Sequence, residues 1–194
     1  MPREVATQLA MLKDLMEYLE LPLKTDLKNF KMPPARCNFH EGKKGIKIID
    51  SSYNAHIISM SSVLEMMTEM QTPHKWLVIG DIIDQGKLEG VEHKKLAQLL
   101  LDVHAEKIVM IGRRTHSYTY PLIKDKTDCV SFEKPQDALA YLEEHLTGKE
   151  TVMFKGSQYL EWIVEKLLKN ESEKCELARQ DEAHRRRRAS WGLN

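Results

Sequence analysis

The sequence predicts an α/β fold with a mostly parallel sheet and helices on both faces, and three observations support this prediction. Short apolar runs alternate with longer amphipathic stripes along most of the chain, as in repeated strand–helix units. The runs are about four residues long and rich in β-formers, which is typical of strands buried on both faces. One of them, Ile46–Ile49, opens into the polar segment Asp50–His56, the kind of strand end where α/β proteins bind ligands.

The N-terminal segment predicts a helical appendage. Apolar side chains recur at three- and four-residue intervals from Val5 to Leu19, so one face of this helix needs a surface to bury against. The paired prolines of Met32–Arg36 then interrupt regular structure, because proline lacks an amide donor and restricts its neighbour. We therefore expect residues 1–30 to form an appendage that ends at a domain boundary.

The next segment, residues 31–170, predicts a Rossmann-like α/β domain. The predicted strands are Ile46–Ile49, Trp76–Ile79, Ile108–Ile111, Cys129–Phe132 and Val152–Phe154. The predicted helices are Met60–Met70, Val91–Val103, Gln136–Leu146 and Tyr159–Leu168. Alternation of this kind implies right-handed crossovers within one sheet. The charged tail, residues 171–194, predicts one more helix that ends near Gly192.

Composition and charge limit the partners of this chain. Lysine plus arginine equals aspartate plus glutamate at 29 each, so no overall field attracts nucleic acid or an anionic membrane. No apolar run approaches the roughly 18 residues of a membrane span, and no secretion signal is visible. Three widely spaced cysteines lack a CxxC pattern, as expected of reduced thiols. The sequence therefore predicts a cytoplasmic protein that binds neither nucleic acid nor membrane.

The segment Gly80–Gly86 raises the hypothesis of a metal site. It resembles the GDxxDRG block of the calcineurin-like metallophosphoesterases, in which acids at a strand end hold two metal ions. Those enzymes need a DxH block upstream, whereas Ser52 occupies the histidine position here. They need GNH downstream, whereas two arginines follow Gly112 and would repel divalent ions. We therefore expect no metal site and keep metallophosphoesterase as a remote alternative.

Four blocks in a fixed order carry a second resemblance. Asn29–Arg36 is similar to an NFxPPxGR linker, Ile49–Ala55 to DDSYNAN, Val78–Gly86 to LGDMxELG, and Phe154–Ser157 to VKGS. From about Asn29 to its end, the chain resembles the C-terminal domain of the Mur ligases. It is most similar to their MurF branch, the UDP-N-acetylmuramoyl-tripeptide:D-alanyl-D-alanine ligases.

This resemblance implies an activity and a set of site residues. In the family this domain closes over a central domain that binds ATP and magnesium. The ligase forms an acyl phosphate on a UDP-muramoyl peptide, which the amine of D-alanyl-D-alanine attacks. By resemblance, the nucleotide side of the cleft consists of Arg36, Asp50, Ser51, Tyr53 and Asn54. The side that faces the incoming dipeptide consists of Lys155, Gly156 and Ser157.

Structural explanations stay open for these residues. Ser51 stands where the family has its second aspartate, which leaves Asp50 as the acid for the ribose hydroxyls. An alternative for Asp50 and Ser51 is that they cap the following helix. An alternative for Arg36 is an ion pair across the linker. For Lys155–Ser157 it is a plain strand-to-helix turn in which Gly156 provides the bend and Ser157 the cap.

The sequence also lacks a feature that ligation requires. It contains no GxxxxGK followed by serine or threonine, the loop that cradles the phosphates of ATP. We therefore expect a MurF-like C-terminal domain that is inactive alone, with no catalytic residue and no tightly bound cofactor. Its partners would be the N-terminal and central ligase domains, in the same chain or in trans. The alternative is a stand-alone interaction or nucleotide-binding module, with self-association through the N-terminal helix.

Overall fold

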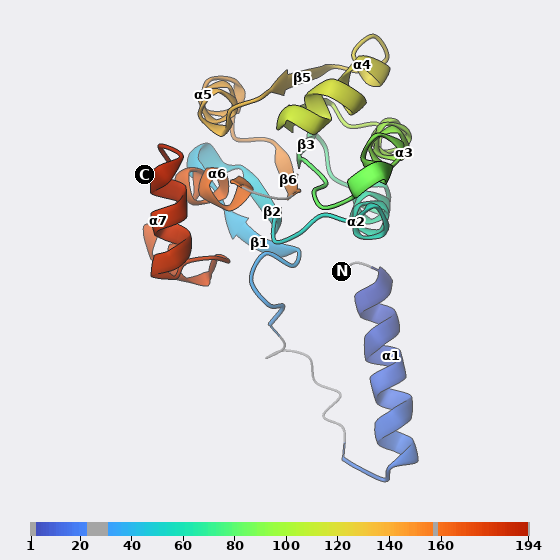
Figure 1. The fold of residues 1–194 in the computed structure, drawn as a ribbon. Helices are drawn as coiled ribbons and strands as arrows, with labels where there is room; N and C mark the ends of the chain where they lie inside the picture. Colours follow the sequence, from blue (N-terminus) through green and yellow to red (C-terminus); the bar gives the residue numbers. More distant parts are fainter. Residues whose placement is uncertain (1–2, 23–30, 157–158, 194) are drawn as a thin grey trace.

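A six-stranded sheet forms the centre of the protein in the computed structural model, which describes residues 3–22, 31–156 and 159–193 (Figure 1). The strands are β1 (Asn38–Glu41), β2 (Lys47–Ser51), β3 (Lys75–Gly80), β4 (Lys107–Ile111), β5 (Cys129–Phe132) and β6 (Thr151–Lys155). Their order is β1-β2-β6-β3-β4-β5, and all neighbours are parallel except β1 and β2. The mostly parallel α/β sheet and its five predicted strands are therefore confirmed.

Helices cover both faces of this sheet, as predicted. The longer helices are α1 (Arg3–Tyr18), α2 (Ile57–Glu69), α3 (Glu89–Asp102), α5 (Pro135–His145), α6 (Leu160–Leu167) and α7 (Glu182–Ser190). The shorter segments are η1 (Lys43–Gly45), η2 (Gly86–Leu88), the π-helix η3 (Thr115–Thr119), α4 (Tyr120–Ile123) and η4 (Glu171–Glu176). Figure 1 shows α2 and α3 on one side of the sheet and α5 and α6 on the other.

Each face of the sheet has its own hydrophobic core. Along β3, Leu77 belongs to the core under α2 and α3, whereas Val78 belongs to the core under α5 and α6. Both side chains are fully buried, because successive residues of a strand point to opposite faces. Burying a side chain of this size stabilises the fold by about 1.5–3 kcal/mol. The continuous apolar runs of the sequence are thus explained by burial on both sides.

Two parts of the fold differ from the prediction. Strand β1 was not predicted, because its four residues include one exposed apolar side chain, Phe39, and otherwise polar ones. The predicted C-terminal helix is confirmed as α7, which ends near Gly192, but it does not extend over the whole tail. The tail begins with η4, and a segment in which Arg179 has a φ of +57° separates η4 from α7. The second helix starts afresh at Asp181, whose carboxylate accepts a hydrogen bond from the amide of His184.

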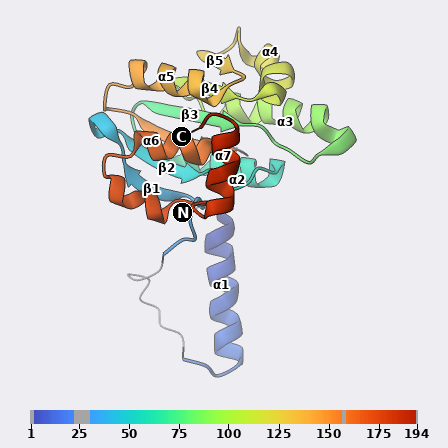
Figure 2. The ribbon, with the colours of Figure 1, turned by 60° about the vertical axis from the view of Figure 1, so that its left-hand side comes forward.

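Helix α1 extends away from the α/β body (Figures 1 and 2). Its N-terminal half contacts α2, but several large apolar side chains are exposed: Met11, Leu12, Leu15, Tyr18 and Leu19. The predicted apolar stripe is real, and much of it has no covering surface among the described residues. The division of the chain at residues 30 and 170 stays a prediction, and so does self-association through this helix. Within the described residues, no helix has the length and hydropathy to span a membrane.

Candidate functional site

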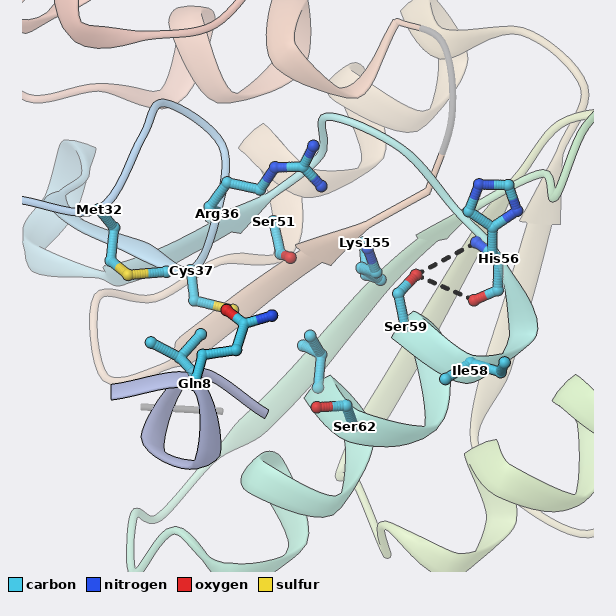
Figure 3. A pocket seen from close by; sticks show the side chains of 12 residues that line it. Gln8, Met32, Arg36, Cys37, Ser51, His56, Ile58, Ser59, Ser62 and Lys155 are labelled. Carbon is cyan, nitrogen blue, oxygen red and sulfur yellow. Dashed lines mark hydrogen bonds between the residues drawn. The ribbon is translucent and has the colours of Figure 1, made fainter. Parts of the chain in front are cut away.

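The predicted corner lies where three parallel strands end. Ser51, at the end of β2, is in register with Lys155 of β6, and Lys155 is in register with Ile79 of β3. A pocket of about 470 Å³ opens here between α1, α2 and the ends of β2 and β6 (Figure 3). Arg36, Ser51 and Lys155 all line it. Residues predicted for the nucleotide side and the dipeptide side thus share one pocket.

Tyr53 is held between two arginines. The guanidinium carbon of Arg36 lies 4.4 Å from the centroid of its ring, and that of Arg179 lies 4.9 Å away. Cation–π contacts of this kind stabilise a ring that is only partly buried, and Tyr53 is 38 % exposed. Arg36 is itself exposed and has no carboxylate partner among the described residues. The alternative of an ion pair for Arg36 therefore finds no support.

Arg179 reaches this corner from the C-terminal segment. Its Nη2 donates to the carbonyl of Tyr53, and also lies 3.4 Å from Oδ1 of Asn54. Its Nη1 is 3.4 Å from a carboxylate oxygen of Glu161, which is 4 % exposed. Burial raises the pKa of Glu161, and the charge of Arg179 opposes this rise. Sequence reasoning missed Arg179, because a single arginine in a charged tail carries no signal of long-range contact.

Asp50 faces the interior rather than the pocket. Its side chain is fully buried, and Oδ1 accepts a hydrogen bond of 3.0 Å from the amide of Ser52. Oδ2 has no partner among the described residues. Burial raises the pKa of this carboxyl, partly offset by its bonds to Ser52. In this conformation a ribose cannot reach the carboxylate, so the predicted contact with nucleotide requires a rearrangement and stays a prediction.

The alternative in which Asp50 and Ser51 cap the following helix is wrong. Helix α2 begins at Ile57 and is capped by His56, whose amide donates to the hydroxyl of Ser59 at 3.1 Å. Ser51 is 4 % exposed and lines the pocket, and so does Cys37. Ser51 therefore belongs to the pocket wall, and its contact with nucleotide stays a prediction.

Lys155 is a buried cation. It is 2 % exposed, and its Nζ donates to the carbonyl of Asn54 at 2.6 Å. Burial lowers the pKa of Lys155 to about 8, with a further lowering from the charge of Arg36. The lysine thus ties the end of β6 to the polar segment after β2. Gly156 follows it and packs directly on the backbone of Gly80, while Ser157 lies outside the described residues.

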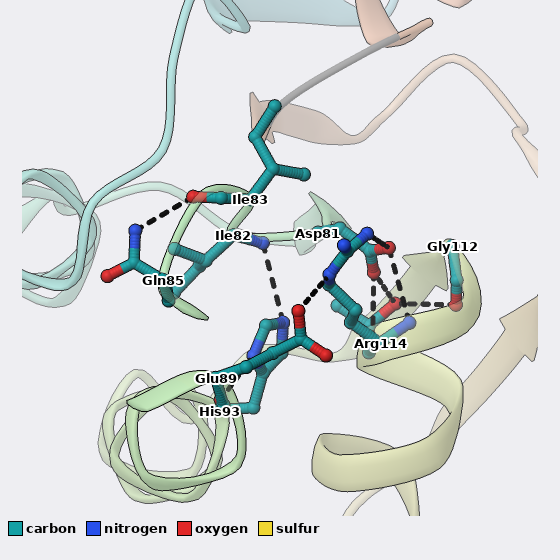
Figure 4. A network of polar contacts seen from close by, with 9 residues as sticks. Asp81, Ile82, Ile83, Gln85, Glu89, His93, Gly112 and Arg114 are labelled. Atoms are coloured by element: carbon teal, nitrogen blue, oxygen red, sulfur yellow. Dashed lines mark hydrogen bonds and ion pairs between the residues drawn. The ribbon is translucent and has the colours of Figure 1, made fainter. Parts of the chain in front are cut away.

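Asp81, the first of the two aspartates in the Gly80–Gly86 segment, accepts several hydrogen bonds from the loop after β4 (Figure 4). Asp81 accepts from the amides of Arg114 and Thr115 at 3.2 and 2.8 Å, and from the Thr115 hydroxyl at 3.1 Å. The guanidinium of Arg114 lies 3.7 Å from Asp81 and 2.5 Å from Glu89. No group of three or more metal-ligating side chains occurs in the part of the chain that the structure describes. Asp81 thus braces the loop after β4, and the metallophosphoesterase alternative gains no support.

The comparison with protein families decides the identity of this domain. Residues 35–158 match the family model described as Mur ligase, glutamate ligase domain. The chain belongs to the Mur ligase family. The matched range contains Arg36, Tyr53 and Lys155, and it ends before the C-terminal segment that supplies Arg179. The resemblance drawn from the four sequence blocks is therefore confirmed as a C-terminal Mur ligase domain.

Curated relatives of this Mur ligase domain are UDP-N-acetylmuramoyl-tripeptide–D-alanyl-D-alanine ligases. The Bacillus subtilis (strain 168) ligase is 24 % identical over 149 residues, which cover 74 % of this chain and 33 % of the relative. The Rickettsia prowazekii (strain Madrid E) ligase is 25 % identical over 112 residues, which cover 58 % of this chain and 25 % of the relative. The chain thus spans about a quarter to a third of the length of these relatives.

Solved structures of this family share the fold. The MurF ligase of Thermotoga maritima in complex with ADP has a TM-score of 0.58 at 22 % identity, covering 74 % of this chain and 32 % of that protein. MurC, the UDP-N-acetylmuramate-alanine ligase of Thermotoga maritima, has a TM-score of 0.63 at 16 % identity, covering 86 % and 37 %. At these identities the comparison establishes the α/β architecture alone.

Replacing Arg179 with alanine is expected to lower the free energy of unfolding by about 1 kcal/mol, because Glu161 stays buried without its cation. The double variant R179A/E161Q should lose less, since it removes the unpaired charge as well. Arg186→Ala is the matched control, because Arg186 and its partner Glu182 are both highly exposed. Urea unfolding of the four proteins measures the effect. Equal losses for R179A and R186A would contradict the bracing role of Arg179.

Proposed function

We propose that this chain supplies the C-terminal domain of a MurF-type ligase, which joins D-alanyl-D-alanine to a UDP-muramoyl peptide at the expense of ATP. The observation that carries this proposal is a pocket lined by Arg36 and Lys155, with Arg36 stacked on Tyr53, within a matched Mur ligase domain. Further support comes from the curated relatives, whose names specify this reaction. The proposed arrangement is an appendage of residues 1–30, the ligase domain at 31–170 and a charged tail at 171–194.

Arg36 is proposed to contact the ribose or phosphates of ATP held by a central domain. Its guanidinium is exposed, stacked on Tyr53 and free of carboxylate partners among the described residues. A planar, permanently charged fork of this kind suits bidentate contact with phosphate oxygens. The half-exposed Tyr53 ring and the Asn54 side chain would form the neighbouring wall, and Lys155 would hold the Asn54 backbone in place.

The ATP and magnesium of the reaction are proposed to bind in a central domain. The phosphate-binding loop GxxxxGK followed by serine or threonine is absent from this sequence, and its backbone amides, lysine and hydroxyl are what hold ATP and magnesium. The chain is therefore proposed to need the N-terminal and central ligase domains, in the same polypeptide or in trans. An interaction module remains the second candidate, favoured by the exposed apolar face of α1.

A domain exchange tests this function. Residues 31–194 would replace the corresponding domain of the Bacillus subtilis ligase, and the product of D-alanyl-D-alanine addition would be measured. We expect ligation by the chimera, a loss of about tenfold in kcat/KM for Arg36→Ala, and no change for Arg186→Ala. The chain alone, mixed with both substrates and ATP, should release no phosphate.

Two results would overturn the proposal. One is phosphate release from ATP by the chain alone. The other is a chimera that is folded by circular dichroism and binds ADP, yet makes no product. Light scattering addresses the second candidate, since an interaction module that uses α1 should form dimers that a polar substitution at the exposed Leu15 disrupts.

A further inference from the structure

The pocket under α1 carries cations and polar donors without any acid in its lining. Its polar wall is formed by Gln8, Arg36, Ser51, His56, Ser59, Ser62 and Lys155 (Figure 3). None of the described residues that line it is an aspartate or a glutamate, in a chain where acidic and basic residues are equal in number. Two cations in a wall whose described residues carry no carboxylate favour an anionic ligand, and the carboxyl whose charge acts on Lys155 is that of Asp50, which is buried outside this wall.

One hydroxyl in this wall lacks a partner. Ser62 is 5 % exposed and lines the pocket, and its Oγ has no hydrogen-bond partner among the described residues. A buried hydroxyl without a partner is unfavourable, because it has lost its bonds to water. Ser59 is different, since its hydroxyl donates to the carbonyl of His56 and accepts from the His56 amide. The Ser62 hydroxyl is thus a donor that an acceptor atom in the pocket would satisfy.

Lys155 also has donor groups without an acceptor among the described residues, and its positive charge favours an anionic one. Its ammonium donates to the Asn54 carbonyl, which leaves two of its three N–H groups for other acceptors. Burial lowers the pKa of Lys155, and the nearby charge of Arg36 lowers it further. An anion between the two side chains would offset both effects.

The rest of the wall is apolar. Val5 of α1, Met32, and Ile58 and Val63 of α2 line the same space of about 470 Å³. This volume lies within the range of small-molecule sites. Donors from two cations, a hydroxyl and the Gln8 amide suit the three terminal oxygens of a phosphoryl group better than the two oxygens of a carboxylate.

We propose that this pocket binds a small phosphorylated molecule with an apolar body, and that α1 forms one wall of the site. This inference goes beyond the proposed function, because it requires neither a central domain nor ATP. The two share Arg36 and Lys155, whereas Gln8, Ser62 and the apolar wall belong to the pocket site alone.

Calorimetry on the full chain at pH 7 tests this site with phenyl phosphate, inorganic phosphate and benzoate. Phenyl phosphate should bind most tightly, because it fills both parts of the pocket. Ser62→Ala should weaken its binding about tenfold, whereas Ser61→Ala should not, since Ser61 lies on the same helix but outside the pocket. Lys155→Met should abolish binding.

A second readout is the pH dependence of affinity. Between pH 7 and 9 phenyl phosphate stays a dianion, while Lys155, whose pKa is about 8, loses its proton. The groups whose charges act on Lys155 are Cys37, Arg36 and Asp50. Binding should therefore weaken by about tenfold over this range and take up a proton at pH 8 and above.

Three results would overturn the inference: no heat of binding with phenyl phosphate, equal affinities for the Ser61→Ala and Ser62→Ala variants, or benzoate binding as tightly as phenyl phosphate. These results are independent of the ligase proposal. The ligase proposal is tested by product formation in the chimera, whereas the pocket site is tested by calorimetric binding to the full chain.

Discussion

Replacing Gly156 with alanine is expected to lower the free energy of unfolding by about 3 kcal/mol. Gly156 follows β6, and a Cβ added there would lie 2.5 Å from the amide nitrogen of Gly80 and 2.9 Å from its carbonyl carbon, with the Cα closer still. All three are backbone atoms at the end of β3, so no side-chain rotation relieves the contact. Two central strands of the sheet would have to separate, which disturbs both hydrophobic cores.

Gly90→Ala is the matched control for this prediction. Gly90 lies in α3, and a Cβ there meets the ring of Tyr118 at 3.7 Å, an ordinary contact distance. Alanine is favoured over glycine in a helix by up to about 1 kcal/mol, so this variant should be as stable as the parent or more so. Urea unfolding followed by circular dichroism gives both values. Unfolding midpoints for G156A and G90A that agree within error would refute the packing argument.

The close approach at Gly156 also refines a prediction from the sequence. The turn hypothesis assigned Gly156 a bend that needs glycine for its backbone angles, but the left-handed φ lies further on, at Tyr159. Glycine is required at position 156 because the chain passes against Gly80. Whether the segment also faces a dipeptide stays a prediction, since Ser157 lies outside the described residues.

The buried parts of the fold could be predicted from the sequence because burial leaves a strong pattern. A central strand such as β3 is covered on both faces, so it must be a continuous apolar run, and Trp76–Ile79 was recognised for that reason. Edge strand β1 has the weaker pattern of a strand with one exposed face, with Phe39 exposed and His40 buried. Its pairing with β2 depends on tertiary contacts that no local pattern reports.

The candidate site was predictable in position but not in detail. The four sequence blocks predicted that the site lies at the ends of the strands now labelled β2 and β6, because the carboxyl ends of parallel strands meet at one edge of a sheet. The burial of Asp50 and the stacking of Arg179 on Tyr53 could not be foreseen. The stacking depends on how the C-terminal segment folds back onto this corner, and that segment lies beyond the matched family range.

Replacing Lys155 with methionine is expected to raise the free energy of unfolding by about 2 kcal/mol at pH 7. The pKa of Lys155 falls from 10.5 to about 8 on folding, which corresponds to a penalty of about 3 kcal/mol for burying the charged form. Methionine has a similar length and no charge, so it removes this penalty. Part of the gain is lost because the Asn54 carbonyl loses its donor at 2.6 Å.

The gain from Lys155→Met should depend on pH in a defined direction. Below pH 8 the lysine is protonated in both the folded and the unfolded state, so the penalty is fully present in the parent protein. Between about pH 8 and 10.5 the folded state has already released its proton while the unfolded state still holds one, so the parent gains stability as pH rises. The difference in the free energy of unfolding between K155M and the parent should therefore shrink from pH 7 to pH 10.

Lys94→Met is the matched control, because Lys94 lies at an exposed position of α3. It should change the free energy of unfolding by less than about 0.5 kcal/mol at either pH. A K155M variant that is less stable than the parent at pH 7 would contradict this prediction. It would mean that the buried ammonium of Lys155 stabilises the fold, and that a role in ligand binding is not needed to explain the lysine.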